Sequence, residues 1–232
     1  MNNIKSFPTA KETAKALATF LKDKINASNT FYLAVSGGST PKMLFEAMTA
    51  IKVDIAWNKL QLFWVDERCV APEHEESNYR MTFESLLSNV PLSEDNIHRM
   101  KGELSPEDGI VDYQQEIKYL PTSDKLPQFD LIILGMGDDG HTASIFPPSK
   151  ELITVESDLA IGTNPYSGQK RLTLTGRTIK NAKAIFFHVT GTNKASVLDE
   201  ILNDKGNCKT YPSYYFKGDK VEWWLDDAAL GK

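Results

Sequence analysis

Cysteine and long apolar runs are both scarce in this chain. Only Cys69 and Cys208 occur among its 232 residues. Two thiols cannot build a disulfide framework, and free cysteine suits a reducing compartment. Residues 1–5 contain no apolar segment typical of a secretory signal, and no apolar run approaches the length of a bilayer-spanning helix. We therefore expect a cytoplasmic protein without a membrane partner.

An excess of positive charge is also missing. Lysine and arginine together number 26, against 31 acidic residues, which gives a net charge of −5. Proteins that bind nucleic acid over a broad surface carry a basic patch or stripe, so no nucleic-acid partner is expected. An acidic chain that binds an anion must instead concentrate a few cations at one place.

The histidines and cysteines lack the spacing of common metal sites. His74, His98, His141 and His188 form no i, i+4 pair, and no Cys-x-x-Cys occurs. We expect neither a metal nor a cofactor. His188 lies in an apolar run and is interpreted as a hydrogen-bonded core residue.

What is present is an alternation of apolar runs with segments of helical periodicity. The runs typical of strands are 31–35, 60–65, 129–134, 171–175, 184–189 and 221–225. Helix starts are predicted at Thr9, 39–41, Ser77 and Ser105, and a further helix over 193–202. This alternation predicts an α/β fold with a mostly parallel sheet covered on both faces. Residues 1–232 are expected to form a single domain.

The most informative stretch is Gly-Met-Gly-Asp-Asp-Gly-His-Thr at 135–142, directly after the apolar run 129–134. In open α/β sheets, ligands bind beyond the carboxyl ends of the strands, and histidine moves protons near neutral pH. His141, together with the two carboxylates of this loop, therefore indicates an acid/base site. The alternative is a solvated Asp-Asp-Gly turn with an incidental histidine.

Other expected strand ends carry groups suited to an anion. Gly37, Gly38, Ser39 and Thr40 precede a predicted helix, where free backbone N–H groups and the helix dipole favour negative charge. The segment 36–41 matches neither a Walker A loop nor a dinucleotide fingerprint. A tight turn with an N-cap residue is the alternative.

Two further groups contain the candidate cations. The triplet Asp66-Glu67-Arg68 follows the run 60–65, where the alternative is a surface ion pair of little energetic worth. Arg171 and Lys194 supply a planar fork and a mobile point charge, both suited to phosphate, although either alone is more often solvated. Together with the glycine segment, they predict a sugar-phosphate site.

Taken together, these segments make the chain resemble the glucosamine-6-phosphate isomerase/6-phosphogluconolactonase family over nearly its whole length. The matching segments are 36–41, 66–68, 77–80, 134–147 and 171–175, with Gly191 and Lys194. The resemblance implies a three-layer α/β/α domain with a modified Rossmann-like sheet, and neither nucleotide nor metal. It also implies hydrolysis of 6-phospho-D-glucono-1,5-lactone in the oxidative pentose phosphate pathway. We expect a monomer or a weak homodimer.

The resemblance also implies roles for single residues. His141 resembles the general base, and Asp139 a polar partner that shapes the site. Arg68 is a candidate to bind substrate or stabilise developing negative charge, and Asp66 to orient that corner. The phosphate-binding group implied by the match comprises Gly37, Gly38, Ser39, Thr40, Arg171 and Lys194.

Two positions depart from the family pattern. Asp138 stands where the family often has proline, and the sequence assigns it no role. The segment 164–170 differs from the commoner proline-rich approach to the arginine strand, which makes the match at Arg171 less direct than the match at His141.

Two rival functions remain open. Glucosamine-6-phosphate isomerases continue their Asp-Gly-His motif with Ile-Ala-Phe-Asn-Glu-Pro, which supplies a carboxylate; here 142–148 contains none, and the next is Glu151. A non-catalytic sugar-phosphate sensor would need Arg171 and Lys194, but would have little reason to keep His141 with Asp139.

Overall fold

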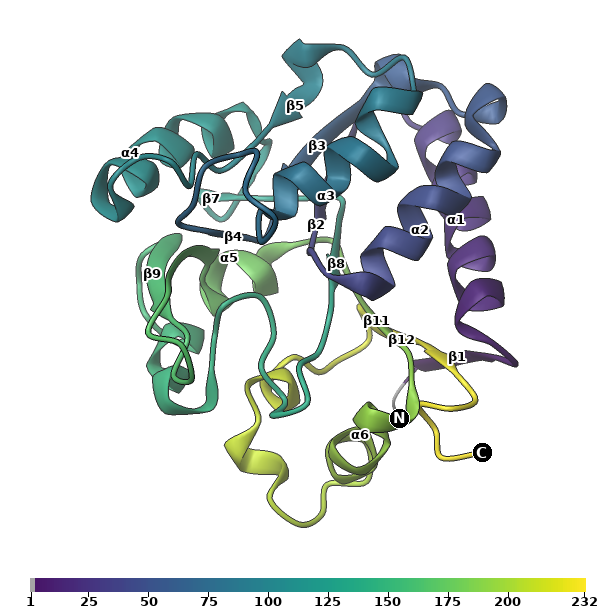
Figure 1. Cartoon of the computed structure of the whole chain (residues 1–232), viewed down its shortest axis with the longest axis vertical. Coiled ribbons are helices and arrows are strands. Elements are labelled where there is room, and N and C mark those ends of the chain that lie inside the picture. The colour runs from purple at the N-terminus through teal and green to yellow at the C-terminus, as the bar shows by residue number, and fades with distance from the viewer. Residues whose placement is uncertain (1–2) are drawn as a thin grey trace.

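A parallel sheet of seven strands forms the centre of the molecule, in the order β1-β12-β11-β8-β2-β3-β5 (Figure 1). The computed structural model describes residues 3–232; Met1 and Asn2, part of the N-terminal stretch considered above, lie outside the described residues. The strands of this sheet are β1 (Asn3–Phe7), β2 (Phe31–Val35), β3 (Leu60–Trp64), β5 (Ile97–His98), β8 (Leu131–Leu134), β11 (Ala184–Val189) and β12 (Val221–Asp226). Every pairing within it is parallel.

Helices cover both faces of this sheet. They are α1 (Ala10–Ala27), α2 (Ser39–Ala50), α3 (Asn78–Ser85), α4 (Pro106–Glu116), α5 (Gly176–Asn181) and α6 (Ala195–Leu202). One buried cluster joins α1 and α2 to one face, and the other joins α4, α5 and α6 to the opposite face. All four residues of β8 are buried, as expected for an inner strand covered on both sides. The predicted three-layer α/β/α fold is confirmed.

Helix starts follow from local capping. The Thr9 hydroxyl accepts from the Glu12 amide at 3.2 Å, and the Ser77 and Ser105 hydroxyls accept from the amides of Arg80 and Asp108. Each satisfies an N–H group that has no partner within its helix. The predicted helix over 193–202 begins as a 3₁₀ turn at Thr192–Lys194 and continues as α6.

Two small sheets accompany the large one, and here the sequence interpretation needs correction. Residues 66–68, expected as a polar strand end, form a strand of their own. The run 171–175 does not join the parallel sheet. Instead β4 (Asp66–Arg68), β10 (Lys170–Leu174) and β9 (Leu159–Thr163) form an antiparallel sheet in the order β4-β10-β9. The connection around 121–127 contains a short hairpin of β6 (Thr122–Ser123) and β7 (Leu126–Pro127). Pairing partners are chosen by tertiary packing, which apolar content alone does not encode.

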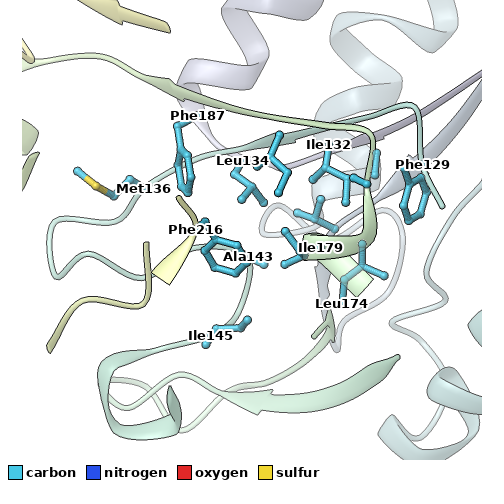
Figure 2. Packing of buried hydrophobic residues seen from close by; sticks show 14 of the residues in the cluster. Phe129, Ile132, Leu134, Met136, Ala143, Ile145, Leu174, Ile179, Phe187 and Phe216 are labelled. Carbon is cyan, nitrogen blue, oxygen red and sulfur yellow. The ribbon is translucent and has the colours of Figure 1, made fainter. Parts of the chain in front are cut away.

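The buried cluster on the α4–α6 side extends past the end of β8 into the loop that follows. Figure 2 shows Ile132 and Leu134 of this strand together with Met136, Ala143 and Ile145 from the following loop. Met136 lies near the start of the glycine-rich stretch and Ala143 directly follows it, and both are buried. The segment is therefore fixed to the core at both ends, which holds it more rigidly than its glycine content alone would suggest.

Among residues 3–232, no helix is long and apolar enough to cross a membrane.

Candidate active site

A cleft of about 240 Å³ opens at the carboxyl ends of β2, β8 and β11. This is where ligands bind in open α/β sheets. Its walls come from the loops after these strands, from the N-terminus of α2 and from the small antiparallel sheet. The sequence-predicted residues that line it are Gly37, Gly38, Ser39, Thr40, Asp66, Arg68, His141, Arg171 and Lys194. Asp139 lies behind His141, in an adjoining hollow.

The loop after β8 presents His141 to the cleft by means of two glycines. A Cβ at Gly137 would lie 2.1 Å from His141 Nδ1, so only glycine leaves room for the imidazole there. Gly140 has a φ of +74° and its N–H donates to the Gly137 carbonyl at 3.0 Å. Although 135–140 has the spacing Gly-x-Gly-x-x-Gly, it does not lead directly into a helix, as a dinucleotide loop does.

His141 and Asp139 form a short hydrogen bond. Their Nδ1 and Oδ1 atoms are 2.6 Å apart, and Asp139 Oδ1 also accepts from the His141 backbone N–H at 3.1 Å. Burial opposes ionisation of Asp139, but the hydrogen bond and charge of His141 outweigh it and lower the pKa of this carboxyl to about 2. An ionised carboxylate only accepts, so Nδ1 of His141 is the donor in this bond; in a neutral imidazole, Nε2 then carries the lone pair.

Tyr166 completes this arrangement from the loop between β9 and β10. Its hydroxyl donates to the other oxygen of Asp139, Oδ2, at 3.0 Å. The ring of Phe146 packs against His141 with centroids 4.6 Å apart. Sequence reasoning missed both residues, although Tyr166 lies in the segment noted as departing from the family pattern. Its position beside Asp139 depends on how two distant loops fold together.

The N-terminus of α2 forms the opposite wall. Gly38 is its N-cap with a φ of +106°, and no side chain among residues 3–232 caps it. The first N–H groups of the helix are thus left for an anion. At Gly37, a Cβ would meet Asn78 Oδ1 at 1.8 Å. Asn78 is held by its own bond to the Asp66 carbonyl at 2.9 Å and also lines the cleft.

Two arginines enter the cleft from the small sheet. Arg68 on β4 and Arg171 on β10 are directly paired in its register. Like charges directly opposite on neighbouring strands are unfavourable. Burial, and then the nearby Arg68 charge, lower the pKa of Arg171. Arg68 Nε is buried without a partner among the described residues, while Arg171 lies over the Phe146 ring at 5.6 Å. An anion bound between these guanidinium groups would relieve their repulsion.

Acidic side chains fix the β4 end of the cleft. Asp66 is buried, and its Oδ2 accepts from the Ser144 hydroxyl at 2.6 Å, which ties β4 to the loop after His141. Glu67 points away from the cleft lining and accepts from the backbone N–H groups of Asn78 and Tyr79, both at 2.8 Å. Burial raises the pKa of Glu67, although these amides favour its charged form. Glu67 thereby fixes the start of α3, a role the sequence reasoning missed.

Lys194 forms an ion pair with Asp138. The same carboxyl oxygen, Oδ1, accepts from Asn193 Nδ2 at 2.9 Å. The loop carrying Lys194 begins at Gly191, whose φ is +95° and whose N–H donates to Asp226 at the end of β12 at 3.0 Å. Asp138, to which the sequence assigned no role, thus contacts one of the predicted phosphate ligands.

The interpretation of His188 as a hydrogen-bonded residue is wrong. It is buried in β11, as expected, but neither ring nitrogen has a partner among the described residues. Burial lowers the pKa of His188 to about 4, so the ring is neutral near pH 7. Burial, rather than a polar partner, therefore determines its charge state, and His188 also lies in the lining of the cleft. Residues 3–232 contain no group of three or more His, Cys, Asp or Glu that could hold a metal ion.

Comparison with known proteins places this geometry in context. A family model described as glucosamine-6-phosphate isomerases/6-phosphogluconolactonase matches residues 6–224. The chain is 40% identical over 199 residues to a 6-phosphogluconolactonase of Treponema pallidum, with 83% of each chain covered. It is 38% identical over 234 residues to one from Aggregatibacter actinomycetemcomitans, with 99% of each covered. The crystal structure of 6-phosphogluconolactonase from Thermotoga maritima has a TM-score of 0.84 and 28% identity, and covers 97% of this chain and 99% of that chain.

Proposed function

Because the chain belongs to the glucosamine-6-phosphate isomerase/6-phosphogluconolactonase family, we propose that it is a lactone-hydrolysing enzyme, a 6-phosphogluconolactonase. Its substrate is 6-phospho-D-glucono-1,5-lactone and its product is 6-phospho-D-gluconate. This hydrolysis is a step of the oxidative pentose phosphate pathway. The observation that carries this proposal is the 2.6 Å hydrogen bond between His141 and Asp139. This pair lies at the edge of a cleft that is also lined by the N-terminus of α2, where free N–H groups can bind an anion.

In the proposed reaction, His141 acts as the general base. Its Nε2 takes a proton from a water molecule as the water oxygen bonds to C1 of the lactone. The carbonyl electrons move onto oxygen and form a tetrahedral intermediate. When the bond between C1 and the ring oxygen breaks, His141 returns the proton to the departing ring oxygen. Base catalysis of this kind contributes roughly 10²–10⁴-fold.

Asp139 supports the base without touching the substrate. Its negative charge stabilises the imidazolium that forms during the reaction, and its hydrogen bond keeps the imidazole in the tautomer with a free Nε2. Asp139 is therefore a positioning residue, with Tyr166 holding its second oxygen.

We assign the cations of the cleft to two groups of the substrate, its phosphate and its reacting carbonyl. The segment 37–40, with Arg171 and Lys194, binds the 6-phosphate, which lies remote from the reacting carbonyl and supplies binding energy that positions C1. Arg68, Arg171 and Lys194 all line the adjoining hollow with His141. We assign Arg68 to the oxyanion, because its buried Nε has no partner among the described residues. Asp66 holds β4, which carries Arg68, against the loop after His141 by accepting from the Ser144 hydroxyl.

An isomerase or deaminase is the second candidate, because the family includes glucosamine-6-phosphate isomerases. The segment 142–148 carries no carboxylate, and Asp66 is the sole acidic residue among those described that line the main cleft. Asp66 is already bound to Ser144. The lack of a free carboxylate beside His141 favours the lactonase.

One assay separates these functions. Purified protein is mixed with freshly generated 6-phosphogluconolactone, and acid release is followed above the rate of spontaneous hydrolysis. We expect rapid hydrolysis, with no ammonia released from glucosamine 6-phosphate. Ammonia release would assign the isomerase class instead. Binding of 6-phosphogluconate without turnover of either compound would indicate a sensor.

A further inference from the structure

The Lys194–Asp138 contact links two loops across the mouth of the cleft. Asp138 follows β8 and Lys194 follows β11, and the Asn193 amide reinforces the link at 2.9 Å. The Lys194 side chain is 20% exposed, while that of Asp138 is 65% exposed. The lysine therefore lies in the cleft wall, and its counter-ion faces solvent.

We propose that Asp138 is a positioning residue that sets substrate affinity by competing with the 6-phosphate for Lys194. This inference rests on the proposed function, which assigns Lys194 to the phosphate. In the free protein the carboxylate holds the ammonium in place. In the complex the phosphate takes over the ammonium, and Asp138 turns toward water.

Lys194 can exchange Asp138 for the phosphate because its side chain is more mobile than that of Arg171. Arg171 is buried, stacked on Phe146 and bonded through Nε to Gln169 at 3.2 Å, so it is held in one place. Lys194 ends in a compact charge on a flexible stem with three donors. Asp138 recovers its hydration when displaced, because most of its side chain is already exposed. Exchanging partners at Lys194 therefore requires little rearrangement.

The competition acts on substrate and product alike, because both carry the same phosphate. An internal carboxylate beside a dianionic group weakens binding of both, which raises KM and the Kd of the product. The chemical step lies at His141 and does not involve Asp138. The inferred signature is thus a change in KM, and in affinity for free phosphate, without a matching change in the rate of proton transfer.

Asp138→Asn tests this, because it removes the charge but keeps an oxygen that can accept from Asn193. The expected result is a fall in KM of about twofold to fivefold, the range typical of a partly exposed ion pair, with kcat unchanged. The Kd of inorganic phosphate, measured by calorimetry, should fall by a similar factor. Asp199→Asn is the matched control: Asp199 also accepts from an asparagine and a lysine, Asn203 at 2.7 Å and Lys205 at 2.6 Å, but it lies outside the cleft.

A double-mutant cycle tests whether Asp138 acts through the lysine. In a Lys194→Met background, Asp138→Asn should no longer tighten phosphate binding. An equal gain in both backgrounds would mean simple repulsion and overturn the inference, as would an unchanged KM and phosphate Kd in the single variant. Because phosphate binding needs no turnover, failure to hydrolyse the lactone would defeat the proposed function while leaving this result readable.

Discussion

At the scale of single residues, His141 carries the clearest functional expectation. Replacing it with alanine should lower kcat by roughly 10²-fold or more, since this is the contribution expected of a general base. The fold should persist, because the imidazole is partly exposed at the cleft edge. Steady-state kinetics corrected for spontaneous hydrolysis, with circular dichroism as the folding control, gives the answer. Turnover near that of the wild type would remove His141 from the mechanism.

Asp139 leads to a prediction about stability and pH. Its pKa is lowered from an ordinary 3.8 to about 2, although burial acts in the opposite direction. A carboxyl whose pKa is lower in the folded state stabilises the protein above its unfolded pKa, and this stabilisation is lost as pH falls through the folded pKa. Asp139→Asn should therefore lower the free energy of unfolding near pH 7, and the difference should shrink between about pH 4 and pH 2. Urea unfolding at several pH values measures this difference; a gap that stays constant with pH would exclude the ionised pair as its source.

The same variant should slow catalysis less than His141→Ala does. An asparagine oxygen can still accept from Nδ1, so the base remains, while the charge that stabilises the imidazolium is gone. A loss in kcat as large as that of His141→Ala would mean that Asp139 itself takes part in proton transfer.

Residue identities could be predicted from sequence where the local pattern determines their surroundings. His141 follows a buried strand within a glycine-rich loop, and that context alone indicated a site. Tyr166 and Asp138 could not be assigned, because their partners lie far away in the chain, 27 and 56 residues respectively. His188 was misjudged because an apolar run reveals burial but not whether polar partners lie within reach.

At the scale of elements, Gly137 tests how tightly the loop after β8 positions the base. Gly137→Ala places a Cβ 2.1 Å from His141 Nδ1 and 2.8 Å from Asp139 Oδ1, so the imidazole must move. A displacement of about 1 Å at a reacting group can cost about 10²-fold. We expect a loss of that order in kcat/KM with a small change in Tm, because the imidazole can swing toward solvent.

Gly135→Ala is the folding control for that experiment. Its added Cβ would meet no described atom within 4 Å, so its Tm should match that of the wild type. If Gly137→Ala retained full activity, catalysis would not depend on the observed position of the His141 imidazole.

Elements with strong local signals were predicted well, and elements defined by pairing were not. The strand at 31–35 and the helix that starts at 39 match β2 and α2, because a buried apolar run and a glycine–hydroxyl helix start act locally. β4 has three residues, Asp-Glu-Arg, and no strand-like composition. Its existence depends on backbone pairing with β10. β1 was missed because its edge position leaves most of its side chains exposed.

At the scale of the whole molecule, the phosphate should act as the main substrate handle in a protein of net negative charge. Hydrogen bonds to charged groups contribute about 1.5–3 kcal/mol each. Arg171→Ala, or removal of the phosphate from the substrate, should each cost about tenfold to a hundredfold in kcat/KM. The combined loss should be smaller than the product, since both changes remove the same contact. Comparable rates on gluconolactone and its 6-phosphate would contradict the prediction that the phosphate is the main binding group of the substrate.

The order of strands in the large sheet has a consequence for how the chain is made. β12 is the last strand in sequence, yet it lies between β1 and β11, and its Asp226 holds the Gly191 loop that leads to Lys194. During synthesis, β1 emerges first and has no neighbour until residues 221–226 have left the ribosome. The large sheet cannot form in full, nor can the lysine loop be fixed, before residues 221–226 have emerged. A nascent chain therefore carries an exposed β1 and an unfinished cleft until residues 221–226 have emerged, and we expect activity only after that point.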